Sequence, residues 1–153
     1  MSGDTEERMT GTRPSHVGLC TPDLEASLRF WVDGLGFEVA DGYDLDTTML
    51  PGLGAALEVD GTVAVRSQMI RRDGVSIELL AYAEPAPTGT PSTSRGQVGL
   101  THFAFWVDDL DAVVTRLVEH GGTVLEDTHQ FLGVDLVFLT DPSGVRVELM
   151  ARP

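Results

Sequence analysis

Lysine is absent from this sequence, because all ten basic residues are arginines. Mechanisms that need a Schiff-base lysine or a general-base lysine are therefore excluded. Basic residues of any kind are also few, since 24 acidic residues outnumber them and give a formal net charge of -14. This balance disfavours nucleic acids and anionic membrane surfaces as partners, and it leaves cationic or neutral small molecules as the easier ones.

Cysteine and long apolar runs are also nearly missing. Cys20 is the only cysteine, so no disulfide can form within the chain, which is compatible with a reducing compartment. No apolar run approaches the roughly 20 residues that a membrane-spanning helix needs. Residues 1–13 are polar and charged, which predicts a disordered tail and not a signal peptide. We therefore expect a cytoplasmic protein without membrane contact.

An internal repeat organises what is present. The 28 residues from Ser15 align without a gap with those from Thr101, at an offset of 86, and this places His16 opposite His102. Further along, GVSIELL from Gly74 matches GVRVELM from Gly144 at an offset of 70. Glu78 then lies opposite Glu148.

Each copy of the repeat predicts a βαβββ unit. A short strand is followed by apolar residues at helical spacing, then by a glycine-containing helix end and further strands. The boundaries predict a first module at 14–83, a linker rich in proline, glycine, serine and threonine at 84–99, and a second module at 100–153. The first copy carries 16 extra residues around 44–61, which we interpret as a lengthened loop. It either covers a pocket or is a plain surface excursion.

Hairpins complete each unit. Strands at 63–71 and 75–82 flank a turn whose Asp-Gly pair favours a hairpin, and the turn at 141–144 is its counterpart. Side chains alternate between the faces of a strand, so Glu78 points away from its apolar neighbours, and Glu148 does the same. Each carboxylate thus lies in a strongly apolar strand. A bound metal ion is one way to offset the cost of an unpaired carboxylate there.

The two histidines and the two glutamates occupy equivalent places in the two copies. A lone histidine at a strand start is usually a hydrogen-bonded core residue. If the copies pack about a pseudo-twofold axis, however, His16, Glu78, His102 and Glu148 approach that common axis. The pattern predicts a shared metal site, with a buried polar network as the alternative.

These motifs resemble the vicinal oxygen chelate superfamily of glyoxalases, methylmalonyl-CoA epimerases, ring-cleaving dioxygenases and antibiotic-resistance proteins. The resemblance covers residues 14–152 and rests on H-V-G-L at His16, I-E-L-L at Glu78, T-H-F-A-F at His102 and D-P-S-G-V-R-V-E-L from Asp141. It implies an α+β fold in which two tandem βαβββ modules form a cup-shaped, curved mixed sheet around a metal site. It also implies frequent dimerisation, so we expect a homodimer, although the cup can close within one chain or across a dimer.

The resemblance further assigns roles to the four residues. The family's ligand positions for one divalent metal ion match His16, Glu78, His102 and Glu148. A set of two nitrogens and two carboxylates suits Ni, Co, Mn, Fe or Zn. Such an ion polarises substrate oxygens, so a proton next to a carbonyl becomes removable. Glu148 is the first candidate for the catalytic base and Glu78 the second. The expected function is an isomerase, epimerase or glyoxalase-type lyase acting on a small molecule or a thioester.

Two other functions stay open on the same scaffold. One is an Fe(II)-dependent dioxygenase, which typically uses two histidines and one glutamate, so the fourth ligand argues against it. The other is a protein that binds and sequesters a drug or metabolite. Arg66, Arg71 and Arg72 form the one basic cluster noted in the sequence, and we expect the solvated ends of a hairpin there in preference to an anion site. His120 and His129 are expected at the surface.

Overall fold

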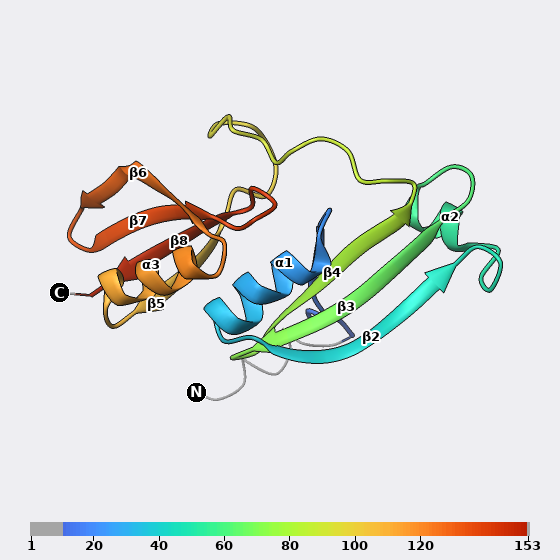
Figure 1. Ribbon diagram of the computed structural model, residues 1–153, viewed down its shortest axis with the longest axis horizontal. Helices are drawn as coiled ribbons and strands as arrows, with labels where there is room; N and C mark the ends of the chain where they lie inside the picture. Colours follow the sequence, from blue (N-terminus) through green and yellow to red (C-terminus); the bar gives the residue numbers. More distant parts are fainter. Residues whose placement is uncertain (1–10, 153) are drawn as a thin grey trace.

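Two four-stranded sheets, one in each half of the chain, make up the fold (Figure 1). The structure is a computed structural model and describes residues 11–152. Most of the disordered tail predicted at 1–13 lies outside these residues. None of the helices within 11–152 is long and apolar enough to cross a membrane.

The first sheet has the strand order β1-β4-β3-β2, and only the pair of β1 and β4 is parallel. Helical segments connect β1 to β2 and β2 to β3. The elements of this half are β1 (Val17–Cys20), α1 (Leu24–Leu28), the π-helical turn η2 (Arg29–Gly34), β2 (Glu38–Asp46), α2 (Leu53–Leu57), β3 (Ala64–Arg72) and β4 (Val75–Glu84).

The second sheet repeats this arrangement with the order β5-β8-β7-β6, and β5 and β8 are again parallel. Its elements are β5 (Phe103–Val107), α3 (Leu110–Glu119), β6 (Thr123–Phe131), β7 (Asp135–Thr140) and β8 (Arg146–Ala151). The two predicted βαβββ modules are therefore confirmed, with one additional helix, α2, in the first.

Local chemistry explains where the elements begin and turn. Asp23 and Asp109, which the repeat aligns, are both extended N-cap residues, and each accepts a hydrogen bond of 2.9 Å from the backbone N–H three residues on. Between β3 and β4, Asp73 and Gly74 both have positive φ values, of 48° and 80°. That conformation suits the tight turn of a two-residue hairpin, which the Asp-Gly pair predicts.

One apolar core serves both sheets. Ile77 and Leu79 of β4 are buried in the same cluster as Val147 and Leu149 of β8. Trp31 is fully buried within it, and its ring packs edge-on against Phe103 of the second half, with a centroid distance of 5.2 Å. Figure 1 shows α1 between the two sheets. Each sheet thus turns one face towards the shared core.

A buried polar contact also joins the two halves. Trp31 Nε1 donates a 3.0 Å hydrogen bond to Asp141 Oδ2, while Asp141 Oδ1 accepts from the backbone N–H groups of Ser143 and Val145. Burial raises the pKa of Asp141 above its ordinary value, and these hydrogen bonds offset part of that effect. Thr21 adds a hydroxyl contact of 3.1 Å with Ser143. The turn before β8 is therefore held from the first half of the chain.

The extra residues of the first module, 44–61, have regular structure of their own. They form the end of β2, a turn in which Asp46 accepts hydrogen bonds from the N–H groups of Thr48 and Met49, and helix α2. Leu53 of this helix packs in a small separate cluster with Val63 and Val65. None of these residues lines either of the two cavities described below. This placement favours the surface excursion over the pocket cover.

Candidate metal centre

His16 and Glu78 meet on the uncovered face of the first sheet. His16 directly precedes β1, and the parallel register sets Gly18 of β1 beside Glu78 of β4. The two-residue alternation along β1 then puts the imidazole on the same face as the carboxylate. Nε2 of His16 lies 3.0 Å from Oε2 of Glu78. Both residues lie in the first module, and they stay predicted ligands.

His102 and Glu148 make the equivalent contact on the second sheet. His102 directly precedes β5, and the register sets Ala104 of β5 beside Glu148 of β8. Nε2 of His102 lies 3.1 Å from Oε2 of Glu148, whose side chain is 15% exposed against 23% for Glu78. The repeat in the sequence is thus a repeat of side-chain geometry.

The hydroxyl of the preceding residue contacts Nδ1 of each imidazole, on the opposite side of the ring from the carboxylate. Ser15 Oγ lies 2.9 Å from Nδ1 of His16, and Thr101 Oγ1 lies 2.8 Å from Nδ1 of His102. A hydroxyl donates or accepts, so it supports the ring whether Nδ1 carries a proton or not. It leaves Nε2 free to point at the carboxylate. We did not identify these two residues from the sequence, although the repeat aligns Ser15 with Thr101.

The donor atoms suit a divalent cation. Imidazole nitrogen and carboxylate oxygen are ordinary ligands of transition metals, and neighbouring octahedral ligands at about 2.1 Å from an ion are about 3.0 Å apart. The separations of 3.0 and 3.1 Å agree with that spacing. Within residues 11–152, however, no group of three or more potential ligands comes together. One chain brings the four predicted residues together as two pairs, which we call the first and second half-sites.

The surroundings of the two half-sites differ. In the first, Oε1 of Glu78 accepts a 2.6 Å hydrogen bond from Ser67 of β3, so both of its oxygens have partners. In the second, Phe138 of β7 packs edge-on against the imidazole of His102, with a centroid distance of 5.1 Å. No residue of the described part of the chain donates a hydrogen bond to Oε1 of Glu148. This oxygen is the more available of the two.

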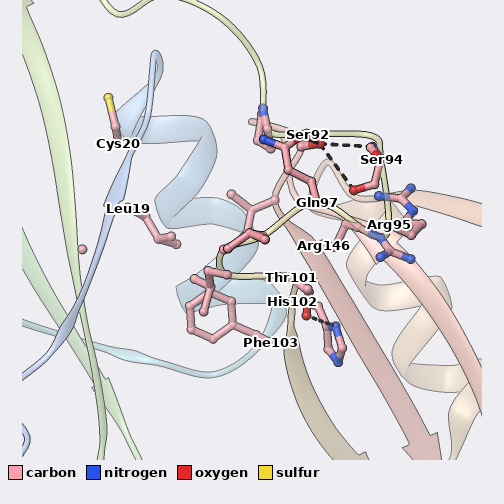
Figure 2. A pocket seen from close by; sticks show the side chains of 16 residues that line it. Leu19, Cys20, Ser92, Ser94, Arg95, Gln97, Thr101, His102, Phe103 and Arg146 are labelled. Carbon is pink, nitrogen blue, oxygen red and sulfur yellow. Dashed lines mark hydrogen bonds between the residues drawn. The ribbon is translucent and has the colours of Figure 1, made fainter.

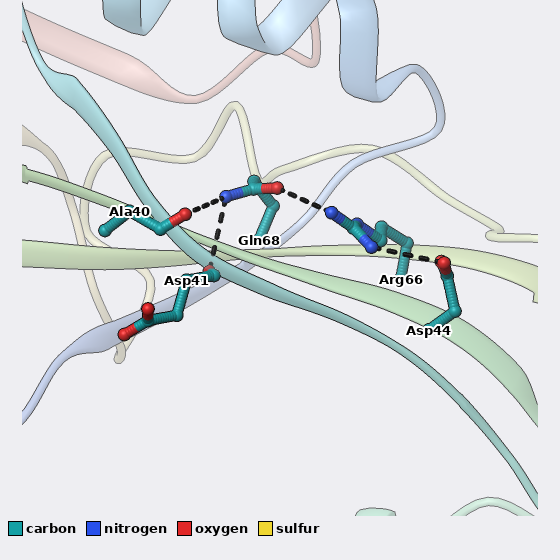
Figure 3. Close-up of polar contacts among 5 residues, drawn as sticks. All are labelled: Ala40, Asp41, Asp44, Arg66 and Gln68. Carbon is teal, nitrogen blue, oxygen red and sulfur yellow. Dashed lines mark hydrogen bonds and ion pairs between the residues drawn. The ribbon is translucent and has the colours of Figure 1, made fainter.

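Arg66 of the predicted basic cluster has a structural role (Figure 3). Its guanidinium donates to Asp44 at 3.2 Å and to Oε1 of Gln68 at 3.0 Å. Gln68 Nε2 in turn donates to the carbonyl groups of Ala40 and Asp41, where the register of β2 shifts. These contacts satisfy the backbone at a β-bulge, and they leave the Arg66 side chain committed.

Arg71 and Arg72 also have acidic partners at the end of the hairpin. Arg71 lies 3.7 Å from Asp41 and Arg72 lies 3.2 Å from Asp73, and these side chains are largely exposed. They border a cavity of about 410 Å³ whose lining includes none of the four predicted ligands. Arg71 and Arg72 thus lie at the solvated hairpin end that the sequence predicts, whereas Arg66 lies further back in β3. His120 lies at the end of α3, and His129 forms an exposed pair with Asp135.

Comparisons with known proteins agree with this fold. Residues 13–149 match the family described as the glyoxalase/bleomycin resistance protein/dioxygenase superfamily. A lactoylglutathione lyase-like protein, terB, from Aspergillus terreus is 31% identical over 90% of this chain and 74% of its own length. A 2-epi-5-epi-valiolone epimerase from an Actinomyces species is 30% identical over 90% and 78%.

A solved structure supports the same assignment at the level of the fold. A glyoxalase family protein from Bacillus cereus superposes with a TM-score of 0.75 at 19% identity, covering 94% of this chain and 97% of its own. Members of the superfamily include lyases, epimerases and dioxygenases, as well as proteins without enzymatic activity. They bind small molecules, generally use a divalent metal and often form dimers. This chain belongs to the glyoxalase/bleomycin resistance protein/dioxygenase superfamily, also called the vicinal oxygen chelate superfamily.

Proposed function

We propose that this protein is a divalent-metal-dependent enzyme that moves a proton next to a carbonyl group, as an isomerase, an epimerase or a glyoxalase-type lyase. The observation that carries this proposal is the pair of half-sites, each with an imidazole and a carboxylate at ligand spacing and a hydroxyl behind the ring. A histidine that only fills space in the core would not require the same carboxylate and hydroxyl partners in both modules. The names of two relatives, a lyase-like protein and an epimerase, favour the same class of chemistry.

The complete site is proposed to form between two copies of the chain. Glu78 and Glu148 point away from the core that joins the two sheets, because their strand neighbours are the residues buried in it. Half-sites on outward faces cannot close on one another within a chain. In a twofold dimer, His16 and Glu78 of one subunit would meet His102 and Glu148 of the partner subunit, and two equal sites would result.

Exposed aromatic residues on the same two faces support this assembly. Tyr43 of β2 lies on the face of Glu78, and its side chain is 57% exposed. Trp106 of β5 lies on the face of His102 and is 54% exposed. Large aromatic side chains in contact with water are typical of surfaces that become covered in an assembly. A second copy of this chain offers the complementary face.

A divalent ion, when bound by the four residues, supplies Lewis-acid polarisation of the substrate's oxygens. The protein must also supply a group that accepts the proton from carbon. Glu148 is assigned this role because its Oε1 has no donor among the described residues, whereas both oxygens of Glu78 are engaged by Ser67 and His16. Glu78 is then mainly a ligand. The smaller exposure of Glu148 also keeps bulk water away from the transferred proton.

Elemental analysis tests the metal site and its assembly together. Two double variants, His16→Ala with Glu78→Ala and His102→Ala with Glu148→Ala, each lose every complete site as homodimers. Co-expressed with different affinity tags, they form a mixed dimer in which one composite site has all four ligands. We expect about one transition-metal ion per mixed dimer and almost none in either homodimer.

The matched control is a mixed dimer in which both subunits carry the same double variant, and it should stay empty. A site formed within one chain would leave the mixed dimer empty as well, which would overturn the assembly. Absence of metal from the wild-type protein after reconstitution would overturn the enzymatic proposal and favour a binding protein. Oxygen consumption with iron and an aromatic diol would instead identify a dioxygenase.

A further inference from the structure

A cavity of about 390 Å³ lies beside the second half-site (Figure 2). Its walls come from the end of β1, from residues 91–103 and from the start of β8. His102 belongs to its lining, so a molecule in the cavity has access to the imidazole. The described residues that line it include two arginines, Arg95 and Arg146, and no acidic residue. This is unusual in a chain whose formal net charge is -14.

Arg146 is positioned by the second sheet itself. It lies two residues before Glu148 on β8, so its side chain extends from the same face. The guanidinium lies over the ring of Phe138, with its central carbon 4.3 Å from the ring centroid. The same ring packs against His102. Phe138 thus holds the imidazole of the half-site and the guanidinium of the cavity in one fixed arrangement.

Arg146 forms no ion pair within the described part of the chain. Its Nε atom is buried and has no hydrogen-bond partner there, and the described ion pairs include neither Arg146 nor Arg95. A buried donor without an acceptor is costly. Arg66, Arg71 and Arg72, by contrast, all have an aspartate within 4 Å.

Arg95 adds a second positive charge to the same wall. Figure 2 shows its side chain next to that of Arg146. Two like charges brought together repel one another unless an anion lies between them. Hydrogen bonds among Ser92, Ser94 and Gln97 order the loop that carries Arg95.

We propose that Arg146 and Arg95 form a recognition site for the anionic group, a carboxylate or a phosphate, of a ligand whose other end reaches His102. Guanidinium groups match both anions with paired hydrogen bonds, and the free Nε–H of Arg146 is one such donor. The inference about the substrate rests on the proposed function: a carbonyl compound that carries an acidic arm. The binding site itself is inferred from the cavity and from the Arg146 Nε–H, which has no hydrogen-bond partner among the described residues.

Nitrogen-15 NMR of the arginine Nε–H groups tests this site directly. The full-length protein is titrated with benzoate and with phenyl phosphate, as purified and again after metal removal with EDTA. Benzamide is the uncharged control for benzoate. We expect a saturable shift of the Arg146 Nε–H signal with an anion in both preparations and none with benzamide. Because the EDTA arm needs no metal, its outcome is independent of the proposed catalysis.

Variants decide which residues bind the anion. Arg146→Gln should weaken binding at least about tenfold and Arg95→Gln by less, because Arg95 is exposed on a loop. Arg146→Lys keeps the positive charge, so it controls for a loss of folding caused by removing that charge. Because it removes the Nε–H donor, it should also weaken anion binding. Arg71→Gln, which changes an arginine outside the cavity, should have no effect.

The arms also separate the two anion classes. Binding of phenyl phosphate alone would assign a phosphate arm, binding of benzoate alone a carboxylate arm, and binding of both a site for either. Equal binding of benzamide, an unmoved Arg146 signal, or an equal loss in the Arg71 variant would each overturn the proposal.

Discussion

The two half-sites have the same ligand geometry but different neighbours. The distance from Nε2 to the carboxylate is 3.0 Å in the first and 3.1 Å in the second, and a hydroxyl contacts Nδ1 in both. In the first, Ser67 fixes the carboxylate. In the second, Phe138 supports the imidazole and an arginine. The proposed metal site would use both halves in the same way, whereas the proposed reaction and the proposed anion recognition depend on what differs between them.

Strand register shows how this difference arises. Ser67 pairs with Leu80 in the first sheet, and the corresponding ladder position of the second sheet pairs Leu136 with Met150. A leucine cannot donate the hydrogen bond that Ser67 gives to Glu78. At the next position on the same face, Met69 faces Glu78 where Phe138 faces Glu148. Two residue differences between the sheets, Ser67 against Leu136 and Met69 against Phe138, thus give Glu78 and Glu148 different surroundings.

The largest expected effect separates the two glutamates. With metal saturated in both variants, Glu148→Gln should lower kcat for a carbonyl substrate by about 10²–10⁴-fold, because an amide cannot accept the proton. Glu78→Gln should lower kcat much less and mainly weaken metal binding. Turnover and metal content are measured on the same samples. A greater loss of kcat in the Glu78 variant would reverse the roles assigned here.

A smaller effect, of the same size in both half-sites, is expected when the hydroxyl group of Ser15 or Thr101 is removed. Ser15→Ala and Thr101→Ala should each weaken metal binding by about 10–100-fold, because each removes the outer partner that orients a histidine. Competition with a fluorescent chelator measures the affinity, and Thr48→Ala, at an exposed turn, is the control. If only one of the two changes matters, the half-sites differ in ligation as well as in their surroundings.

Removing the hydrogen bond between Trp31 and Asp141, which joins the two halves of the chain, should lower the stability of the protein. Trp31→Phe leaves Asp141 Oδ2 without its donor and opens space in the shared core, and it should lower the free energy of unfolding by about 2 kcal/mol. Urea unfolding of this variant is compared with that of Phe131→Leu, which alters an aromatic residue that is 68% exposed and should change stability by less than about 0.5 kcal/mol. Equal effects would mean that Trp31 does not join the halves.

The smallest effect concerns pH. Because burial raises the folded-state pKa of Asp141, the folded protein binds the proton more tightly than the unfolded chain does. This group's contribution to stability therefore falls as pH rises from about 4 through the raised pKa, by less than about 1.4 kcal/mol per pH unit. Asp141→Asn removes this dependence, so its stability relative to the wild type should improve over that range. Parallel curves in urea unfolding at pH 4–7 would contradict it.

Much of the fold follows from the sequence because local patterns act through short distances. The repeat and the Asp-Gly turn predict the succession of strands and helix along each module. The alternation around Glu78 and Glu148 predicts which face of each of those strands is buried. Within each copy of the repeat, each of these signals occupies a short stretch of sequence. They also identify the four candidate ligands, two in each module, but not the separation of these ligands into two His–Glu pairs.

Features that depend on the packing of distant segments could not be predicted. Nothing near Trp31 indicates that its ring nitrogen reaches Asp141, which lies 110 residues away in the chain. Arg95 lies in a segment that reads as a plain linker, and Arg146 gains its meaning from Phe138 and from the cavity wall. The separation of the four ligands into two pairs depends on which faces meet in the shared core.

The matched aspartate caps of α1 and α3 have a consequence for the origin of the molecule. Asp23 and Asp109 make the same bond in two halves that share a topology, as expected after duplication of an ancestral gene for one module. Such a single module would leave the apolar side of its sheet, including Ile77 and Leu79, in water. It would have needed to self-associate before it could persist. Fusion of two copies would make that association permanent, and one half could then diverge from the other.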